Sequence, residues 1–190
     1  ASKYVAEGEF VDEYSDDEKG MTYYCVKNVE GEKVVNTAIL MKYSGSSNDV
    51  DVPATIKPGD VEYTVTVISK LAFNGKTKLT SMSLSKGIEV IEETAFQNCS
   101  GIKKVYLPAT LKEIGDDSFD GCSGLTAVVS GIEEPYSIAN TGLSGSSASL
   151  YVPTGTKKKY IDAKWDFANI FEGERKEVTL ENGMTFAYST

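Results

Sequence analysis

Two acidic side chains, Glu93 and Asp116, stand about 23 residues apart and are the candidates in this sequence for paired-carboxylate chemistry. Such pairs hydrolyse glycosidic bonds when burial raises the pKa of one carboxyl group. We expect both on an exposed edge, where Lys70, one period earlier, pairs with Glu93 at a gain of about 0.2–1 kcal/mol. No nucleophile lies in a recognisable motif, and no Gly-rich phosphate loop is present. We therefore predict no catalytic residues, no enzymatic activity and no cofactor.

Cys99 and Cys122 have the same spacing of about 23 residues, and Cys25 is the third cysteine. Two thiols at equivalent positions of neighbouring coils would lie close together, so a disulfide is one alternative. The other, which we favour, is that both are buried thiols that pack as small apolar residues. The sequence has no histidine and no Cys-x-x-Cys motif, which predicts no zinc site of the common kinds and no metal.

A third candidate site lies on three short segments, Ser81–Leu84, Lys104–Leu107 and Ala127–Ser130, in which apolar residues alternate with other residues. This period of two is typical of strands with one buried face. The residues that alternate with the buried ones would face outward and form a ligand-binding face. The alternative is a solvated face that carries one tyrosine. The six predicted ligand-binding residues are Ser81, Ser83, Lys104, Tyr106, Ala127 and Val129.

These segments belong to a repeat of about 23 residues between Val65 and Ser130, in which apolar residues fall into columns. A period in the twenties is typical of leucine-rich repeats, whose coils bury their apolar edges by stacking. We therefore predict a leucine-rich-repeat solenoid, mainly β, whose strands form one parallel sheet. The main columns are Val65, Ile88 and Leu111; Ile68, Ile91 and Ile114; Phe73, Phe96 and Phe119; Leu79, Ile102 and Leu125; and Met82, Val105 and Val128.

The phenylalanine column should fill the wide part of each coil. Two segments around it, Glu93–Cys99 and Asp116–Cys122, are too short to be stable helices on their own. We predict one helical or 3₁₀ turn in each.

The residues from Ile91 to Leu111 follow the pattern Ile-x-x-x-Ala-Phe-x-x-Cys-x-x-Ile-x-x-Val-x-Leu-Pro-x-x-Leu. This pattern resembles the BspA-type leucine-rich repeat of surface proteins from host-associated anaerobic bacteria. The resemblance covers about residues 50–173. It implies a secreted or surface-anchored binding protein, with adhesion as its usual role. The segment from Tyr151 to Phe167 also resembles the family's C-terminal cap, which implies that Trp165 is a cap residue.

The N-terminal part, residues 1–49, is predicted to be an acidic segment followed by a capping β-hairpin. The run from Glu7 to Glu18 holds seven acidic side chains and lacks the spacing of an EF-hand loop, so we expect a solvated segment and not a calcium site. Gly20–Val29 and Lys33–Tyr43 read as two strands around a turn. Open solenoids need a cap over the exposed core, and this hairpin is the candidate.

Residues 50–153 are predicted to be the solenoid, with an incomplete first coil at Val50–Ile56 and a period that slips after Val128. Residues 154–190 would hold a C-terminal cap with a short amphipathic helix, Lys157–Phe167, whose apolar set is Tyr160, Ile161, Trp165 and Phe167. Two strands, Lys176–Leu180 and Met184–Tyr188, would follow around a turn. They form a hairpin on the cap or begin a further domain.

The 190 residues carry a net charge of −9 at pH 7, with a pI near 4.6. This charge disfavours nucleic acid and anionic lipid as partners. No apolar run is long enough to span a membrane. No signal peptide is visible and the first residue is Ala1, so we expect that a leader has been removed. The predicted function is an adhesin-like, extracellular or cell-surface module that binds a host or neighbouring-cell protein or glycan. The alternative is a structural spacer that presents another domain and binds nothing itself.

Overall fold

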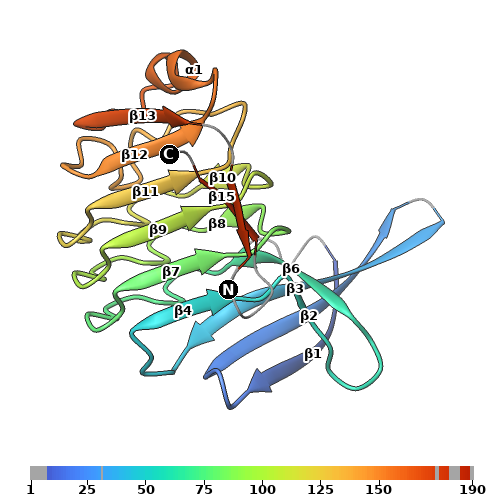
Figure 1. Cartoon of the computed structure of the whole chain (residues 1–190). Coiled ribbons are helices and arrows are strands. Elements are labelled where there is room, and N and C mark those ends of the chain that lie inside the picture. Colours follow the sequence, from blue (N-terminus) through green and yellow to red (C-terminus); the bar gives the residue numbers. More distant parts are fainter. Residues whose placement is uncertain (1–7, 31, 174–175, 180–184, 189–190) are drawn as a thin grey trace.

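Two β-sheets form opposite sides of a stack of coils, and the coils succeed one another along the chain (Figure 1). The structure is a computed structural model that describes residues 8–30, 32–173, 176–179 and 185–188. Mainly β structure with very little helix, in coils of about 23 residues, confirms the predicted solenoid.

The first sheet is parallel and has six strands in the order β13-β12-β11-β9-β7-β4. Three of them have the bounds predicted from the alternating segments. Their inward residues, Met82, Val105 and Val128, are fully buried in register with one another. The strands are β4 (Asp49–Val52), β7 (Ser81–Leu84), β9 (Lys104–Leu107), β11 (Ala127–Ser130), β12 (Ser149–Pro153) and β13 (Asn169–Gly173).

The second sheet is mixed and has seven strands, with the order β1-β2-β3-β6-β8-β10 and β5 paired to β6. Pairing is antiparallel from β1 to β3 and parallel from β3 to β10. Most of this sheet was not predicted. Its strands are β1 (Glu9–Asp16), β2 (Met21–Glu30), β3 (Lys33–Tyr43), β5 (Thr55–Ile56), β6 (Tyr63–Ile68), β8 (Val90–Ile91) and β10 (Glu113–Ile114).

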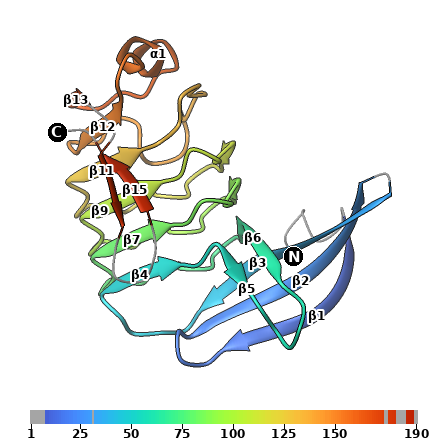
Figure 2. The ribbon, with the colours of Figure 1, turned by 45° about the vertical axis from the view of Figure 1, so that its right-hand side comes forward.

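The predicted N-terminal hairpin is formed by β2 and β3, and β3 continues into the solenoid by pairing with β6. The hairpin extends away from the stacked coils (Figure 2). The acidic run was predicted only as a solvated segment. The structure instead places most of it in β1, the edge strand of the mixed sheet, although most of its side chains are exposed. A bulge between Phe10 and Asp12 interrupts its register with β2. Charges and bulges on an edge strand disfavour pairing with other chains.

The phenylalanine column forms a stacked ladder through the core. Ring centroids of Phe73 and Phe96 lie 4.8 Å apart, and those of Phe96 and Phe119 lie 5.1 Å apart. The backbone follows the same ladder, because the amides of Phe73 and Phe96 donate to the carbonyls of Ala95 and Ser118 at 2.8 Å. Each coil is therefore joined to the next by ring stacking and by backbone hydrogen bonds.

The segments before and after each phenylalanine are turns, and no helix forms there. Isolated hydrogen bonds such as Gln97 N–H to Thr94 O (3.2 Å) have the 3₁₀ spacing that we predicted. A helix cannot develop because Leu71, Thr94 and Asp117, one in each coil, have left-handed backbones with φ of 62°, 57° and 53°.

The period was predicted to slip after Val128, but the coil continues further. The amide of Phe119 donates to Thr141 O at 2.8 Å, as Phe96 does to Ser118. Gly142 then stands where the phenylalanine column would continue. It has φ of +81°, and a Cβ there would lie 2.4 Å from Asp120 N. The side-chain pattern is lost at this position while the backbone path is kept.

The predicted cap helix is shorter than expected, because α1 spans only Lys157–Asp162. Tyr160, Trp165 and Phe167 are buried as predicted, but Ile161 is 51% exposed and the prediction that it packs inward is wrong. The chain leaves the helix through Lys164, whose φ is 65°. Trp165 and Phe167 therefore reach the core from the irregular segment that follows the helix and its turn.

Two further strands, β14 (Lys176–Thr179) and β15 (Thr185–Tyr188), pair antiparallel as predicted, and β15 contacts β12. The expected turn at 181–183 lies outside the described residues. One continuous core runs from Met21 to Phe167. A smaller apolar cluster lies on the other face of the mixed sheet and contains Val26, Ile39, Val67 and Val90. The division of the chain at residues 49/50 and 153/154 remains a prediction.

Candidate functional site

The outward face of the parallel sheet carries two rows of side chains, set by the strand register, and the six predicted residues lie in the middle of both rows. The polar row contains Asp49, Ser81, Lys104, Ala127, Ser149 and Asn169. The aromatic row contains Asp51, Ser83, Tyr106, Val129, Tyr151 and Phe171.

The structure brings the six predicted residues together but does not expose all of them. Lys104 is exposed, and Tyr106 and Val129 are half-buried. Ser83, by contrast, is only 3% exposed, although its row faces outward. The expectation that it is available at the surface is wrong, since alternation along a strand fixes the direction of a side chain but not what lies over it. Figure 1 shows β15 in front of this sheet.

Tyr151 and Phe171 extend the aromatic row and were missed as site residues. Their ring centroids lie 5.3 Å apart with planes at 26°, and Phe171 is 48% exposed. Tyr151 could have been found from the sequence, because Leu150-Tyr151-Val152-Pro153 repeats the pattern of Val105-Tyr106-Leu107-Pro108. Phe171 gives no such signal, since no proline follows its strand and the spacing from β12 differs from 23 residues.

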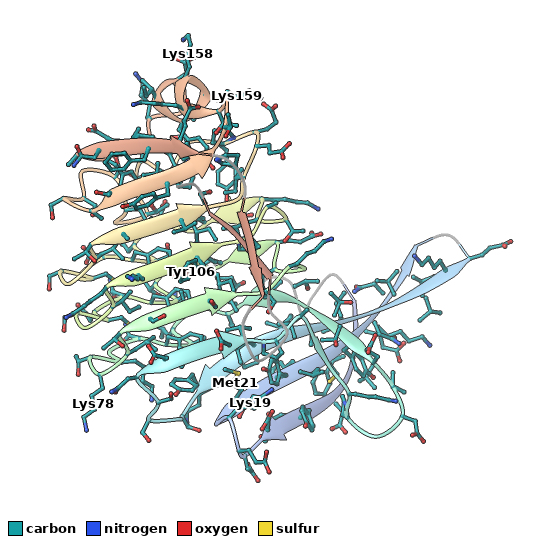
Figure 3. All side chains as sticks on the ribbon, viewed as in Figure 1. Lys19, Met21, Lys78, Tyr106, Lys158 and Lys159 are labelled. Carbon is teal, nitrogen blue, oxygen red and sulfur yellow. The ribbon has the colours of Figure 1, made fainter. Side chains whose placement is uncertain are left out.

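A groove of about 1540 Å³ adjoins the lower part of this face, and of the six predicted residues only Tyr106 and Val129 line it. The turn between β1 and β2 and the start of β2 line the groove through residues 17–21, and the end of β3 with the segment after it does so through residues 43–47. The strand β4 lines it through Asp49, Val50 and Asp51. Figure 3 shows the labelled residues Lys19 and Met21 on the hairpin side and Tyr106 on β9. Sequence reasoning missed the groove because it joins segments that do not share the repeat.

The proposed ion pair between Lys70 and Glu93 is present, and both side chains are about half exposed. The hydrogen bond and the charge of Lys70 lower the pKa of Glu93. The adjacent carboxylate, Glu92, is the more constrained one. It is 6% exposed and accepts hydrogen bonds from Ser69 Oγ (3.1 Å) and from the Lys70 amide (2.9 Å). Glu92 thus joins two coils and is a structural residue that the charge pattern did not reveal.

The cysteines are buried and free. Cys99 Sγ donates to Phe73 O at 3.0 Å and Cys122 Sγ donates to Phe96 O at 3.3 Å, so each thiol points at the preceding coil. Burial raises the pKa of Cys99 to about 11 and that of Cys122 to about 12. This matches the favoured alternative of buried thiols. Among the described residues, no cluster of three or more His, Cys, Asp or Glu side chains could hold a metal ion.

The lysines of α1 make local ion pairs. Lys158 Nζ lies 2.7 Å from Asp162 Oδ2, and the Lys159 ammonium forms an ion pair with the Glu134 carboxylate. Below them, Trp165 Nε1 donates to Tyr136 O at 2.6 Å and the Trp165 ring meets Tyr160 edge-on. The indole has its partner inside the protein, as the cap assignment requires. No helix within the described ranges is long and apolar enough to cross a membrane.

Stacked coils, a parallel sheet on one side and a column of buried rings define a leucine-rich-repeat solenoid. Residues 55–144 match the model of the BspA type leucine rich repeat region, with six copies. These residues, a little under half of the chain, are BspA-type leucine-rich repeats. A comparison with curated proteins gives no match.

Solved structures with the same fold include a leucine-rich-repeat protein of T. pallidum and a leucine-rich cell-surface protein of Faecalibacterium prausnitzii. The first has 19% identity and a TM-score of 0.52, and the match covers 78% of this chain and 57% of that one. The second has 16% identity and a TM-score of 0.50, with 90% and 57% covered. This chain therefore spans 57% of the length of each relative, and the likeness concerns the fold.

Proposed function

We propose that this protein is an extracellular interaction module that binds a host or neighbouring-cell protein or glycan on the outward face of its parallel sheet. The observation that carries the proposal is the pair of rows on this face. An aromatic row with a half-exposed phenylalanine at its end lies beside a polar row that includes one lysine. Aromatic residues beside polar ones are typical of binding hot spots and their rims.

The repeat family and the structural relatives support a location at the cell surface or outside the cell. Solenoids use extended surfaces for binding, and one structural relative is described as a cell-surface protein. On this basis we place the protein at the cell surface or outside the cell, in an adhesin-like role. A spacer that binds nothing itself is the alternative outcome of the experiment below. The absence of enzymatic activity remains a prediction.

The test is binding of the intact chain to a panel of extracellular-matrix proteins and glycans. Two double variants probe the face, Lys104→Ala with Tyr106→Ala and Tyr151→Ala with Phe171→Ala. The control is Glu89→Ala with Lys112→Ala, an exposed ion pair on the mixed-sheet side. We expect at least one face variant to lose about tenfold or more in affinity while its melting temperature and the control stay unchanged. If no panel member binds, the spacer alternative replaces this proposal.

A further inference from the structure

The groove beside the strand face has a shape suited to an extended chain. It begins at the hairpin, crosses β4, and reaches Leu84 on β7, Tyr106 on β9 and Val129 on β11. Neighbouring strands are spaced by about 4.8 Å, so crossing these four strands spans roughly 14 Å. An extended polypeptide advances about 3.3 Å per residue, and the hairpin lengthens the groove further. Five or six extended residues match this length, and 1540 Å³ exceeds the usual range of small-molecule pockets.

The interior of the groove offers apolar surface through half-buried side chains. Tyr106 and Val129 line it and are both half-buried. Pro53 and Pro108 add half-buried rings. Since burial of apolar surface favours binding, an occupant with apolar side chains gains from contact with this surface.

The charges of the groove are unbalanced. Its lining holds the carboxylates of Asp17, Glu18, Asp49 and Asp51 against the two ammonium groups of Lys19 and Lys86, which leaves two negative charges in excess. The Lys19 ammonium lies 3.8 Å from the neighbouring carboxylate of Asp16, which weakens its positive field. All four carboxylates lie at one end of the groove, two in the turn between β1 and β2 and two on β4, so the potential there attracts cations.

We propose that the groove binds an extended, basic segment of a partner protein in which lysine or arginine alternates with apolar residues. The basic side chains meet the acidic end of the groove, and the apolar ones meet its interior. The occupant is a polypeptide because the site combines length, apolar surface and an excess of two charges. This site goes beyond the strand face proposed above, with which it shares Asp49, Asp51, Tyr106 and Val129.

The experiment uses a fluorescein-labelled hexapeptide that alternates lysine with valine, and a second peptide with glutamate in place of lysine. Binding to the full chain is followed by fluorescence anisotropy at low and at 0.5 M salt. The groove variant carries Asp17→Asn, Glu18→Gln and Asp49→Asn, all exposed, and the amide of residue 49 can still accept the Thr80 hydroxyl (3.1 Å). The control carries Asp60→Asn, Glu62→Gln and Asp120→Asn, which change the net charge equally at exposed positions outside the groove.

The lysine peptide should bind, and the groove variant should weaken binding about tenfold, or about 1.4 kcal/mol, and reduce its salt dependence. The control should bind like the unaltered protein, and the glutamate peptide should not bind. The proposal is overturned if the lysine peptide fails to bind, if both variants weaken it equally, or if the glutamate peptide binds as well. If a panel ligand binds and is lost in the strand-face variants while the lysine peptide fails to bind, the proposed function stands and this site is overturned. If the lysine peptide binds and no panel ligand does, this site stands and the proposed function is overturned.

Discussion

The rings of Tyr43 and Phe73 stack with centroids 5.0 Å apart and planes at 25°. Tyr43 is the last residue of β3, and its amide donates to Ala72 O at 2.9 Å, the same bond by which Phe73 reaches Ala95. The N-terminal hairpin thus supplies the first ring of the ladder. It covers the end of the core with the same contacts that join one coil to the next.

Replacing Tyr43 by alanine should lower the free energy of unfolding by about 3–5 kcal/mol, because it removes a buried ring from the end of the ladder. Tyr43→Phe keeps the ring and loses only the hydroxyl, which accepts the Ser47 amide at 3.0 Å, so it should cost about 1 kcal/mol. Urea unfolding followed by circular dichroism measures both. Equal losses in the two variants would show that the hydroxyl and not the ring stack holds the hairpin.

Glu92 and Glu93 are neighbours in sequence, but their replacement should destabilise the protein to different extents. Glu92→Ala removes the acceptor of the buried Ser69 hydroxyl and of the Lys70 amide, at about 1–3 kcal/mol for each group left unsatisfied. Glu93→Ala removes only an exposed ion pair and should cost less than about 1 kcal/mol. Thermal unfolding of the two variants, with Glu92→Gln as the shape-matched control, checks this order. A larger loss for Glu93 would contradict it.

The repeat period was enough to predict the parallel sheet, because one buried residue per coil fixes the register of strands such as β7 and β9. The mixed sheet was not predictable in the same way. Its solenoid strands β8 and β10 have two residues each, too few to show alternation. Tyr43 also escaped prediction, since it precedes Phe73 by about 30 residues and so falls outside the period.

The candidate site was likewise predictable only where it is built from the repeat. The direction of the outward residues follows from strand alternation, so the two rows were predictable over β7, β9 and β11. The burial of Ser83 does not follow from alternation, and the groove depends on how segments outside the repeat fold against the coils. No local pattern encodes that placement, and the acidic lining of the groove looked like an ordinary solvated run.

Gly142→Ala should destabilise the protein more than Gly145→Ala. Both glycines have left-handed backbones, with φ of +81° and +75°, so each substitution adds about 1–2 kcal/mol of backbone strain. Only at Gly142 does the new Cβ also meet backbone, 2.4 Å from Asp120 N, whereas Gly145 has nothing within 4 Å. Midpoints of urea unfolding would separate the two contributions. If the two midpoints shifted equally, close packing at Gly142 would not be what ends the ring ladder.

Stability should fall as the pH rises from about 9 towards 12. The thiols of Cys99 and Cys122 ionise near pH 9 when unfolded, but burial raises their folded pKa values to about 11 and about 12. Between these limits the unfolded chain releases protons that the folded chain retains, so the free energy of unfolding decreases with pH; below pH 9 this contribution is fully present. Burial also raises the pKa of Tyr23 and Tyr160, which should extend the loss above pH 10.

The measurement is urea unfolding at pH 7, 9, 10 and 11, for the unaltered protein and for Cys99→Ala with Cys122→Ala. The double variant should start lower, because it leaves small cavities, and should decline less steeply above pH 9. At pH 8 a thiol reagent should label none of the three cysteines of the folded protein and all three in urea. Only one labelled thiol in urea would reveal a disulfide, and identical slopes in the two proteins would assign the alkaline loss to the tyrosines alone.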